Sequence, residues 1–424
     1  MTAVVRLFVR HRSAVFCRRR SSDALSAPDS LDVLLGEFRS DSEDPTEVAW
    51  RTLREETTTA DFTLLRSGEP LSISDGATDH TVFSFLFEAT GHDDPLPELA
   101  AEGEWIAPTA LLDRDTAPGL WQSYRRVAPD VETIRADATH GATWLSLRAL
   151  EVLRDTAGEI AFGAADGGLE RVRTTARELR TARPSMVVIR NRIDRTMSAA
   201  PATPRAVHDR SVDTITAALD ADQRAAEAAA NTIADRSGSV ATLSRSGTVA
   251  ETLRQSGRSV LVGESRPARE GVDTAEELAA AGLDVTLTTD AALPGRLREE
   301  DVSCVLFGAD RILSSSDVVN KVGSYPLAVA ALDNDIPVFV VATMDKITDT
   351  DELVSESGVS ADVYDGECAV TVSNPIFERV PADLIDGIVT EDGVLDAAAI
   401  ARRADSHRSM SSWTASSNPD DADE

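Results

Sequence analysis

Short apolar runs rich in β-branched residues alternate with helical segments from Gly238 to near the C-terminus. The runs cover residues 239–243, 259–262, 285–288, 302–307 and 338–342, with a further candidate at Val363. Strands that alternate with helices in this way form a parallel sheet with helices on both faces. The pattern therefore predicts a doubly wound α/β subdomain over residues 237–405.

The rest of the chain has other periodicities. Residues 138–236 carry apolar side chains at helical spacing, which predicts a helical subdomain. Residues 1–130 mix short strands at 4–9, 13–17 and 81–87 with one helical stretch at 46–56, which predicts an α+β module. The tail at 406–424 is rich in Ser, Asp, Asn and Pro and is expected to be disordered and acidic. The fold class expected for the whole chain is α/β.

Charge and cysteine content exclude several functions. Seventy-two acidic residues against forty-two basic ones give a formal charge of -30, the opposite of what a phosphate-backbone binder carries, so direct nucleic-acid binding is disfavoured. This acidic surface, with arginine in place of almost all lysine, is typical of proteins that work in concentrated salt. Three distant cysteines fit neither a disulfide framework nor a metal cluster.

Without a signal peptide or an apolar run long enough to span a bilayer, the chain is expected to be cytoplasmic, with no membrane partner.

Polar residues follow four of the predicted strands. In open parallel sheets, ligands bind beyond the carboxyl ends of the strands, where helix N-termini favour phosphate. Each residue alone is also explained by helix capping, a turn or a surface ion pair, but their convergence predicts a site for a phosphorylated ligand. The residues at these ends are Ser244, Ser246, Thr248, Arg266, Glu270, Asp310, Thr343, Asp345 and Lys346.

Lys321 is one of only two lysines in the chain. It lies between Asn320 and Gly323, shortly after Asp310. A compact ammonium that arginine does not replace suits a small oxygen-rich ligand. The alternative is a lysine that stands on a solvated face by chance.

Several motifs occur in a fixed order along residues 138–404. The order is Ser265-Arg266-Pro267 with Glu270-Gly271, then Gly308-Ala309-Asp310, then Asn320 to Ala328, then Asn374-Pro375. Together they resemble the family of the initiation factor 2B alpha, beta and delta subunits, whose relatives include ribose-1,5-bisphosphate isomerase and methylthioribose-1-phosphate isomerase. Arg183-Pro184-Ser185 fits the helical half of this family. The resemblance implies a Rossmann-like ligand-binding subdomain after a helical one.

The resemblance also implies roles for individual residues. In the isomerases, an aspartate and a cysteine serve the transfer between aldose and ketose phosphate. Asp310 matches the aspartate, whereas Ser246 stands at the position of the cysteine and is a far weaker acid, so altered isomerase chemistry is expected. His140 replaces a basic residue of the family. The implied ligand-binding residues are His140, Arg183, Ser244, Thr248, Arg266, Glu270, Asn320, Lys321 and Gly323.

The ligand and partners implied by this family are a phosphorylated ribose or nucleotide and a second copy of the chain, joined through the C-terminal domain. No cofactor is expected in that domain. Because the cysteine is missing, a non-catalytic regulatory oligomer, like the translation-factor subunits, is an open alternative.

A second resemblance concerns residues 43–57. The spacing from Glu43 to Arg51, followed by Glu55 and Glu56, resembles the Nudix box. It implies a Nudix-like domain in which Glu43, Glu55 and Glu56 hold Mg²⁺ against a diphosphate. Thr52 stands where the box has a glutamate, so Thr52→Glu is expected to strengthen metal binding. An acidic helix on a salt-adapted surface would explain the same glutamates without any metal, and a Nudix diphosphatase with a sensor domain is a further alternative.

Overall fold

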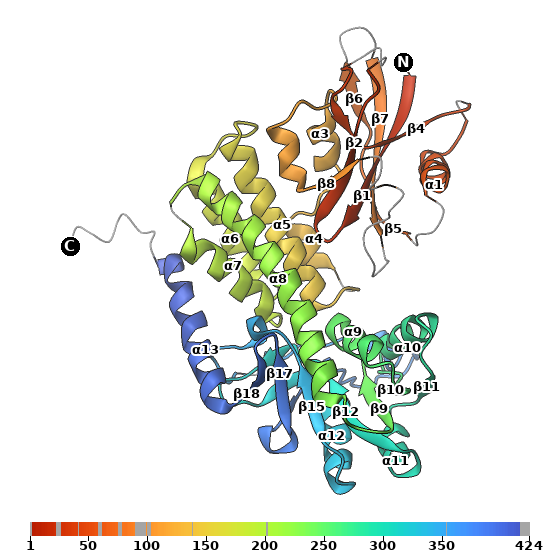
Figure 1. Cartoon of the computed structure of the whole chain (residues 1–424), viewed down its shortest axis with the longest axis vertical. Coiled ribbons are helices and arrows are strands. Elements are labelled where there is room, and N and C mark those ends of the chain that lie inside the picture. The colour runs from red at the N-terminus through yellow and green to blue at the C-terminus, as the bar shows by residue number, and fades with distance from the viewer. Residues whose placement is uncertain are drawn as a thin grey trace, which may run out of the picture. The chain divides into compact units, whose positions relative to one another are not determined.

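The computed structural model describes residues 2–22, 27–40, 42–57, 62–74, 79–89, 99, 103–137, 139–200, 202–352 and 354–415 (Figure 1). The chain divides into two compact units. Unit 1 comprises Met1–Thr133, Arg148–Thr175 and Pro201–Ile215, and unit 2 comprises Ile134–Leu147, Ala176–Ala200 and Thr216–Glu424. The expected helical subdomain at 138–236 is therefore not a compact unit of its own, because its residues are shared between the two. Its helices are α5 (Ala142–Ala161), α6 (Gly168–Ala182), α7 (Val187–Ala199) and α8 (Pro204–Ile233).

Unit 1 is built around an eight-stranded mixed sheet. Its long strands β1 (Thr2–His11) and β7 (Asp79–Ala89) are parallel neighbours, and the other pairings in this sheet are antiparallel. β1 and β7 contain two of the strands expected from the sequence, and β2 covers the third except for Ser13, which lies in the turn before it. The remaining strands are β2 (Ala14–Arg19), β3 (Leu31–Asp32), β4 (Leu34–Glu37), β5 (Phe62–Ser67), β6 (Leu71–Ser74) and β8 (Glu104–Ile106).

Both faces of this sheet are covered. Along β1, Val5, Leu7 and Val9 pack in one apolar core with residues of helix α1 (Pro45–Glu56), whereas Phe8 lies in the opposite core. This alternation follows from the two-residue repeat of a strand. The opposite core also contains residues of η1 (Pro108–Leu112) and α3 (Leu120–Arg125), which precede α4 (Val131–Ala136).

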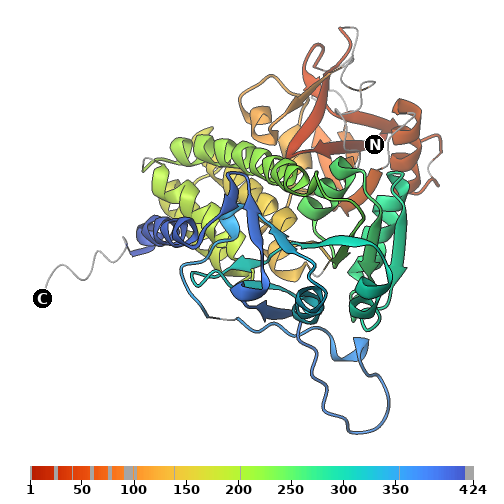
Figure 2. The same ribbon diagram turned by 60° about the horizontal axis from the view of Figure 1, so that its bottom comes forward.

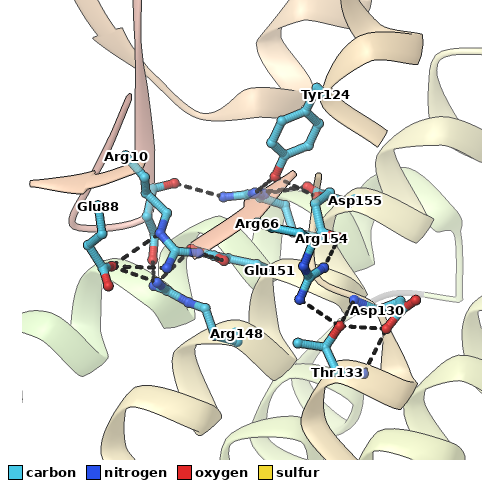
Figure 3. A network of polar contacts seen from close by, with 12 residues as sticks. Arg10, Arg66, Glu88, Tyr124, Asp130, Thr133, Arg148, Glu151, Arg154 and Asp155 are labelled. Carbon is cyan, nitrogen blue, oxygen red and sulfur yellow. Dashed lines mark hydrogen bonds and ion pairs between the residues drawn. The ribbon is translucent and has the colours of Figure 1, made fainter. Parts of the chain in front are cut away.

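A buried network of charged side chains lies within unit 1 (Figure 3). Arg10 of β1 donates to Glu88 of β7 at 3.0 Å and pairs with Glu151 of α5 at 3.3 Å. Arg148 of α5 donates to the same Glu88 oxygen at 3.1 Å and pairs with Glu151 at 2.9 Å. Burial opposes the ionisation of Glu151, but Arg148, Arg10 and Arg154 outweigh it and lower its pKa. Residues 148–161 of α5 therefore belong to the same folded unit as the N-terminal sheet.

Unit 2 contains a seven-stranded sheet in the order β11-β10-β9-β12-β15-β17-β18 (Figure 1). Every neighbouring pair is parallel except β17 and β18. From β9 the chain adds β10 and β11 towards one edge of the sheet. It then adds β12, β15 and β17 on the other side of β9. Rossmann folds have this strand order. The strands are β9 (Ser239–Leu243), β10 (Val260–Gly263), β11 (Val285–Thr288), β12 (Val302–Phe307), β15 (Val338–Val341), β17 (Gly387–Thr390) and β18 (Gly393–Leu395).

The doubly wound arrangement expected from the sequence is confirmed. One core joins the sheet to α8, α9 (Gly247–Ser256) and α10 (Glu270–Ala280). The other joins it to α11 (Leu293–Glu299), α12 (Ser324–Asp333) and α13 (Ala397–Met410). Alternate residues of β15 enter the two cores, as in a strand buried on both faces. The strand suggested at Val363 is wrong, because that residue lies in an exposed segment after η3 (Ser360–Asp362), and β17 is the sixth parallel strand instead.

A small antiparallel sheet in the order β13-β14-β16 lies beyond the carboxyl end of β12. Its strands are β13 (Arg311–Ile312), β14 (Val318–Lys321) and β16 (Phe377–Val380). Figure 2 shows the segment between η2 (Met344–Lys346) and β16 projecting away from the large sheet. η4 (Ala382–Leu384) follows β16.

The C-terminal region is ordered further than expected. Helix α13 continues to Met410 and η5 spans Ser411–Ala415, so the expectation of disorder is wrong for residues 406–415. His407 is buried, and the Trp413 indole donates to Asp194 at 2.9 Å, which anchors this end. Residues 416–424 lie outside the described residues. No helix among the described residues is both long and apolar enough to cross a bilayer.

Candidate functional site

The strand order of unit 2 reverses between β9 and β12, and the candidate site lies at their carboxyl ends. Ser246 caps helix α9 after β9, and its hydroxyl accepts a long hydrogen bond, 3.4 Å, from the backbone of Val249. A Cβ atom added to Gly308, just after β12, would lie 3.0 Å from Ser246 Oγ. The two loops therefore meet, and Asp310 follows two residues later. Ser246 and Asp310, expected from the sequence to act together, belong to adjoining loops.

Asp310 is a partly exposed residue whose carboxyl group is surrounded by charged neighbours. Its backbone N–H donates to Val319 of β14 at 2.9 Å. Burial raises the pKa of Asp310, and the positive charges of Lys346 and Lys321 oppose that rise. Glu356 raises the pKa further. A carboxyl group with a raised pKa beside two ammonium groups is suited to exchanging a proton with a bound ligand.

Lys321 ends strand β14 and is buried. Its Nζ donates to Glu270 Oε1 at 2.5 Å. Glu270 begins α10, and this helix starts so close to β10 that a Cβ on Gly271 would lie 1.8 Å from the carbonyl oxygen of Gly263. Only glycine fits there, and the close approach fixes Glu270 in front of Lys321. The interpretation of Lys321 as part of a site, rather than of a solvated face, agrees with its burial.

Asn320 and Gly323 shape the turn that leads into α12. The Asn320 amide donates to Ser324 Oγ at 2.8 Å, and Gly323 has a φ of 106°, which glycine adopts without strain. The backbone N–H groups of Gly323 and Tyr325 donate to Glu378 at 2.6 and 2.8 Å. The N-terminus of α12 is thus already capped by a carboxylate. Asn320 and Gly323 position Lys321 through the backbone.

Arg266 lies on the exposed loop after β10. Its guanidinium donates to the carbonyl oxygen of Asp362 at 2.7 Å. The neighbouring Ser265 hydroxyl accepts from the backbone of Ser244 at 2.6 Å, which ties this loop to the loop after β9. Ser244 therefore links two strand ends through its backbone, while Thr248 is buried in the first turn of α9.

His140 and Arg183 are joined through Asp137. His140 Nδ1 lies 2.7 Å from Asp137 Oδ2, and its ring stacks on Trp144 with centroids 3.7 Å apart. Arg183 donates to the carbonyl oxygen of Asp137 and pairs with Glu356 at 3.3 Å. The negative charge of Glu356 raises the pKa of Asp310. Because Arg183 pairs with Glu356, it offsets part of that negative charge.

The loop that carries His140 is also tied to the loop after β9. The guanidinium of Arg245 donates to the carbonyl oxygen of Thr139, and Arg245 precedes Ser246 in the sequence. The structure therefore brings His140 and Arg183 to the edge of the site by way of backbone contacts.

Lys346, one of the residues that the sequence places at the strand ends, is buried near Asp310. It follows Asp345, which Arg192 contacts at 3.0 Å and Arg403 at 3.4 Å, with Arg195 as a third partner. Burial opposes ionisation of Asp345, but Arg195 and Arg192 outweigh it and hold its pKa well below the usual value. The sequence places Lys346 at the end of a predicted strand but gives it no part in catalysis or ligand binding.

The cysteines do not reach the site through any described contact. Cys304 lies inside β12 in the core formed with α8, α9 and α10, as the sequence predicts, and burial raises the pKa of its thiol. Cys17 is buried in unit 1, and Cys368 is exposed on the segment before β16. Ser246 therefore keeps the position that the family resemblance gives to a cysteine.

Of the Nudix-box carboxylates, Glu55 and Glu56 lie on helix α1 and Glu43 lies in the turn before it, and each has its own arginine. Glu43 pairs with Arg51. The further pairs are Arg39 with Glu55 at 2.8 Å and Arg18 with Glu56 at 2.8 Å. Among the described residues, no three His, Cys, Asp or Glu side chains are grouped so that they could hold a metal ion. As placed, Glu43, Glu55 and Glu56 do not form a common Mg²⁺ ligand set.

Thr52 does not lie on the carboxylate side of α1. Its side chain is buried, its hydroxyl donates to the carbonyl oxygen of Val48 at 2.9 Å, and a Cβ on Gly36 would lie 2.3 Å from its Oγ1. There is no room for a longer side chain between α1 and β4.

The strand order defines an α/β protein of the doubly wound class. The sequence model of the Initiation factor 2 subunit family matches residues 138–397, which is more than half of the chain. The chain belongs to this family.

Its relatives include enzymes and a translation factor. A methylthioribose-1-phosphate isomerase of Rhodopirellula baltica is 38% identical over 159 residues, 34% of this chain and 45% of the relative, so the chain spans less than half of that relative. A methylthioribose-1-phosphate isomerase of Xanthomonas oryzae pv. oryzae is 32% identical over 319 residues, 67% of this chain and 89% of the relative. The structure of translation initiation factor eIF-2B from Pyrococcus horikoshii OT3 superposes with a TM-score of 0.54 and 27% identity, covering 62% of this chain and 94% of that one.

Proposed function

We propose that unit 2 binds a phosphorylated ribose at the carboxyl ends of β9 and β12 and is related in chemistry to the sugar-phosphate isomerases. The observation that carries the proposal is the contact between the loops of Ser246 and Gly308, with Asp310 flanked by both lysines of the chain. The relatives named methylthioribose-1-phosphate isomerase support the class of ligand.

Different groups around the site would bind different parts of the ligand. The first turn of α9, at Gly247 and Thr248, offers backbone N–H groups and the positive end of a helix dipole to a phosphate. Lys321 supplies a fixed ammonium, and the exposed Arg266 supplies a planar guanidinium. Glu270 would exchange its ion pair with Lys321 for hydrogen bonds to sugar hydroxyls.

The proposed isomerase chemistry is slow. Asp310 is suited to moving a proton between neighbouring carbons of the sugar, because burial favours its neutral form while Lys346 and Lys321 favour its carboxylate. The partner group at the other loop is the Ser246 hydroxyl, which ionises far less readily than a thiol with a pKa of about 8.5. We therefore expect strong binding of an aldose phosphate with slow or absent turnover.

A thermal-shift panel on the full-length protein tests the binding. The panel contains ribose-1,5-bisphosphate, methylthioribose-1-phosphate, nucleoside monophosphates and nucleoside diphosphate derivatives. A ligand at a hundred times its dissociation constant adds about 2.7 kcal/mol of stability, a readily measured rise in Tm. Lys321→Ala should remove the shift, while Arg298→Gln, which breaks an exposed ion pair with Asp333 elsewhere in unit 2, should leave it unchanged. No shift with any of these ligands would refute the proposal.

A regulatory role without catalysis is the second candidate, and Ser246 in place of the thiol favours it. We propose that such a role, like the enzymatic one, uses a homo-oligomer. The exposed apolar residues Tyr325, Val329 and Leu332 recur every three or four residues along α12 and so share one face. Size-exclusion chromatography with light scattering should show a dimer or larger species that Leu332→Glu weakens. A monomer at micromolar concentration would rule out this surface.

We also propose that unit 1 has a Nudix-like domain. The support is the Glu43–Arg51 pair and a surface hollow of about 450 Å³ lined by residues of α1 and the turn before it. Because arginines occupy the carboxylates, weak or absent Mg²⁺-dependent hydrolysis of nucleoside diphosphate derivatives is expected from the full chain. Brisk hydrolysis that Glu56→Gln abolishes would make unit 1 the enzyme of this protein.

A further inference from the structure

Lys346 is a buried cation close to Asp310 that the proposed function leaves without a role. It ends η2, the short turn after β15, and the residue is 7% exposed. Lysine is among the side chains least often buried without a partner. Within the part of the chain that the structure describes, Lys346 is in no ion pair within 4 Å, in contrast to Lys321 with Glu270.

Backbone contacts hold Lys346 beside Asp310. The N–H of Thr348 donates to the carbonyl oxygen of Ile312 at 2.8 Å, and Ile347 and Ile312 form a parallel bridge. Ile312 lies two residues after Asp310, so the turn with Lys346 runs alongside the strand that Asp310 leads into. These contacts fix the two segments relative to each other.

A second set of contacts fixes the turn from the other side. The Asn191 amide of α7 donates to the carbonyl oxygens of Asp345 and Ile347, at 2.9 and 2.8 Å. These are the residues directly before and after Lys346. Arg192 and Arg195 hold the side chain of Asp345. Lys346 therefore lies on a turn that is held by contacts on both sides. Side chains that act in a functional site are held on rigid elements in the same way.

The charges around the pair are few and identifiable. Those that act on Lys346 are Asp310, Asp222 of α8 and Arg192 of α7, and burial lowers the pKa of Lys346 against the two carboxylates. Burial raises the pKa of Asp310, and Lys346 opposes this more strongly than Lys321 does. Glu356 and Arg311 act on Asp310 more weakly. Glu270 forms a direct ion pair with Lys321, whereas the charge of Lys346 acts on both Asp310 and Asp222.

We infer that Lys346 is a positioning residue that stabilises the anionic form of Asp310 and sets the pH range in which Asp310 accepts a proton. Lys321 is then left to hold the ligand. The inference deepens the proposed function and rests on it only in that Asp310 belongs to a ligand site.

Carbon-13 NMR of the full-length protein labelled at the aspartate carboxyl carbons tests this directly, without any ligand. Asp310→Asn identifies the Asp310 signal. In Lys346→Met the titration midpoint of that signal should rise by about one pH unit or more, because a nearby opposite charge is lost. Lys346→Arg should restore most of the difference. An unchanged midpoint in Lys346→Met, or an equal rise in Lys346→Arg, would overturn the inference.

Two further variants keep the test decisive. Lys321→Met removes an equal charge that Glu270 already compensates, so it should shift the midpoint less than Lys346→Met; an equal or larger shift would count against the inference. If Lys346→Met fails to fold, the double variant Lys346→Met with Asp310→Asn should recover a cooperative thermal transition, because both members of the pair are neutral. A double variant no more stable than the single one would refute the pairing. Failure of ribose phosphates to bind would refute the proposed function and leave these results untouched.

Discussion

The ammonium of Lys321 and the carboxylate of Glu270 form an ion pair at 2.5 Å that joins β14 to the start of α10. The Lys321 side chain is 6% exposed and that of Glu270 is 24% exposed. A carboxylate at a helix N-terminus is favoured by the helix dipole, and here it also neutralises a buried cation. The pair therefore serves both the fold and the candidate site.

Lys321→Ala should destabilise the ligand-free protein as well as abolish ligand binding. Loss of one partner of a largely buried hydrogen-bonded pair costs about 1–3 kcal/mol. A lysine on a solvated face, the alternative that the sequence leaves open, would contribute little to stability, but Lys321 is buried. Urea unfolding measures the stability, and Lys321→Arg is the matched control that keeps the charge. An unchanged unfolding midpoint in Lys321→Ala would show that the ion pair contributes nothing.

Ser246→Cys should raise isomerase activity. A thiol at a helix N-terminus ionises more readily than a free one, and general acid–base groups contribute about 10²–10⁴-fold to rate. We expect at least about a 100-fold increase in turnover of the better substrate from the panel. Ser246→Ala should stay at the level of the native protein and lose stability through the missing cap. Equal rates for the cysteine and alanine variants would show that this position takes no part in the chemistry.

The site could be predicted from the sequence where local pattern decides position. Ser246 and Asp310 follow strands whose β-branched residues identify them, and parallel strands bring their carboxyl ends to one edge. The place of Lys346 depends on the bridge between Ile312 and Ile347, a long-range pairing that leaves no local pattern. The burial of Lys321 likewise depends on the distant Glu270.

The parts of the fold that the sequence predicts wrongly have similar causes. β17 is a short strand with few apolar residues and is recognised only by its pairing with β15, so the sequence predicts a strand at Val363 instead. Residues 406–415 are polar, but α13 gains its stability from packing that includes His407 and Ala404. Composition alone therefore predicts disorder where tertiary contacts make a helix.

Thr52→Glu should destabilise unit 1 and leave hydrolysis unchanged. The Nudix-box pattern predicts that this change strengthens metal binding, but Thr52 is buried against Gly36 and the new carboxylate would have no partner. An unpaired charge or a strained helix at this position costs about 2–4 kcal/mol. Arg54→Glu, on the exposed side of the same helix, is the control for an added carboxylate. A rise in Mg²⁺-dependent hydrolysis in Thr52→Glu would contradict the prediction.

His407 should make the protein sensitive to mild acid. Burial and the nearby Arg403 lower the pKa of His407 from 6.5 to about 4, and neither ring nitrogen has a hydrogen-bond partner among the described residues. Below pH 6.5, His407 therefore binds a proton in the unfolded chain but stays neutral in the folded protein. Stability is complete above this value and falls as the pH drops towards 4, by up to about 3 kcal/mol.

The measurement is chemical unfolding between pH 7 and 4 at constant salt. His407→Leu should remove most of this pH dependence, and His140→Leu, at a partly exposed histidine, is the control. Parallel stability curves for the native protein and His407→Leu would exclude His407 as the cause.

The charged network of Figure 3 limits which fragments of this protein can fold on their own. Arg10 and Glu88 come from the N-terminal sheet, but Arg148 and Glu151, which complete the network, come from helix α5. A fragment that stops near residue 130 would keep a buried arginine and lose part of its compensating charge, and such a loss is costly in a protein interior. The N-terminal module is thus discontinuous in sequence. An N-terminal fragment with an intact core would therefore have to include residues 148–175, which lie within the segment that the Initiation factor 2 subunit family matches.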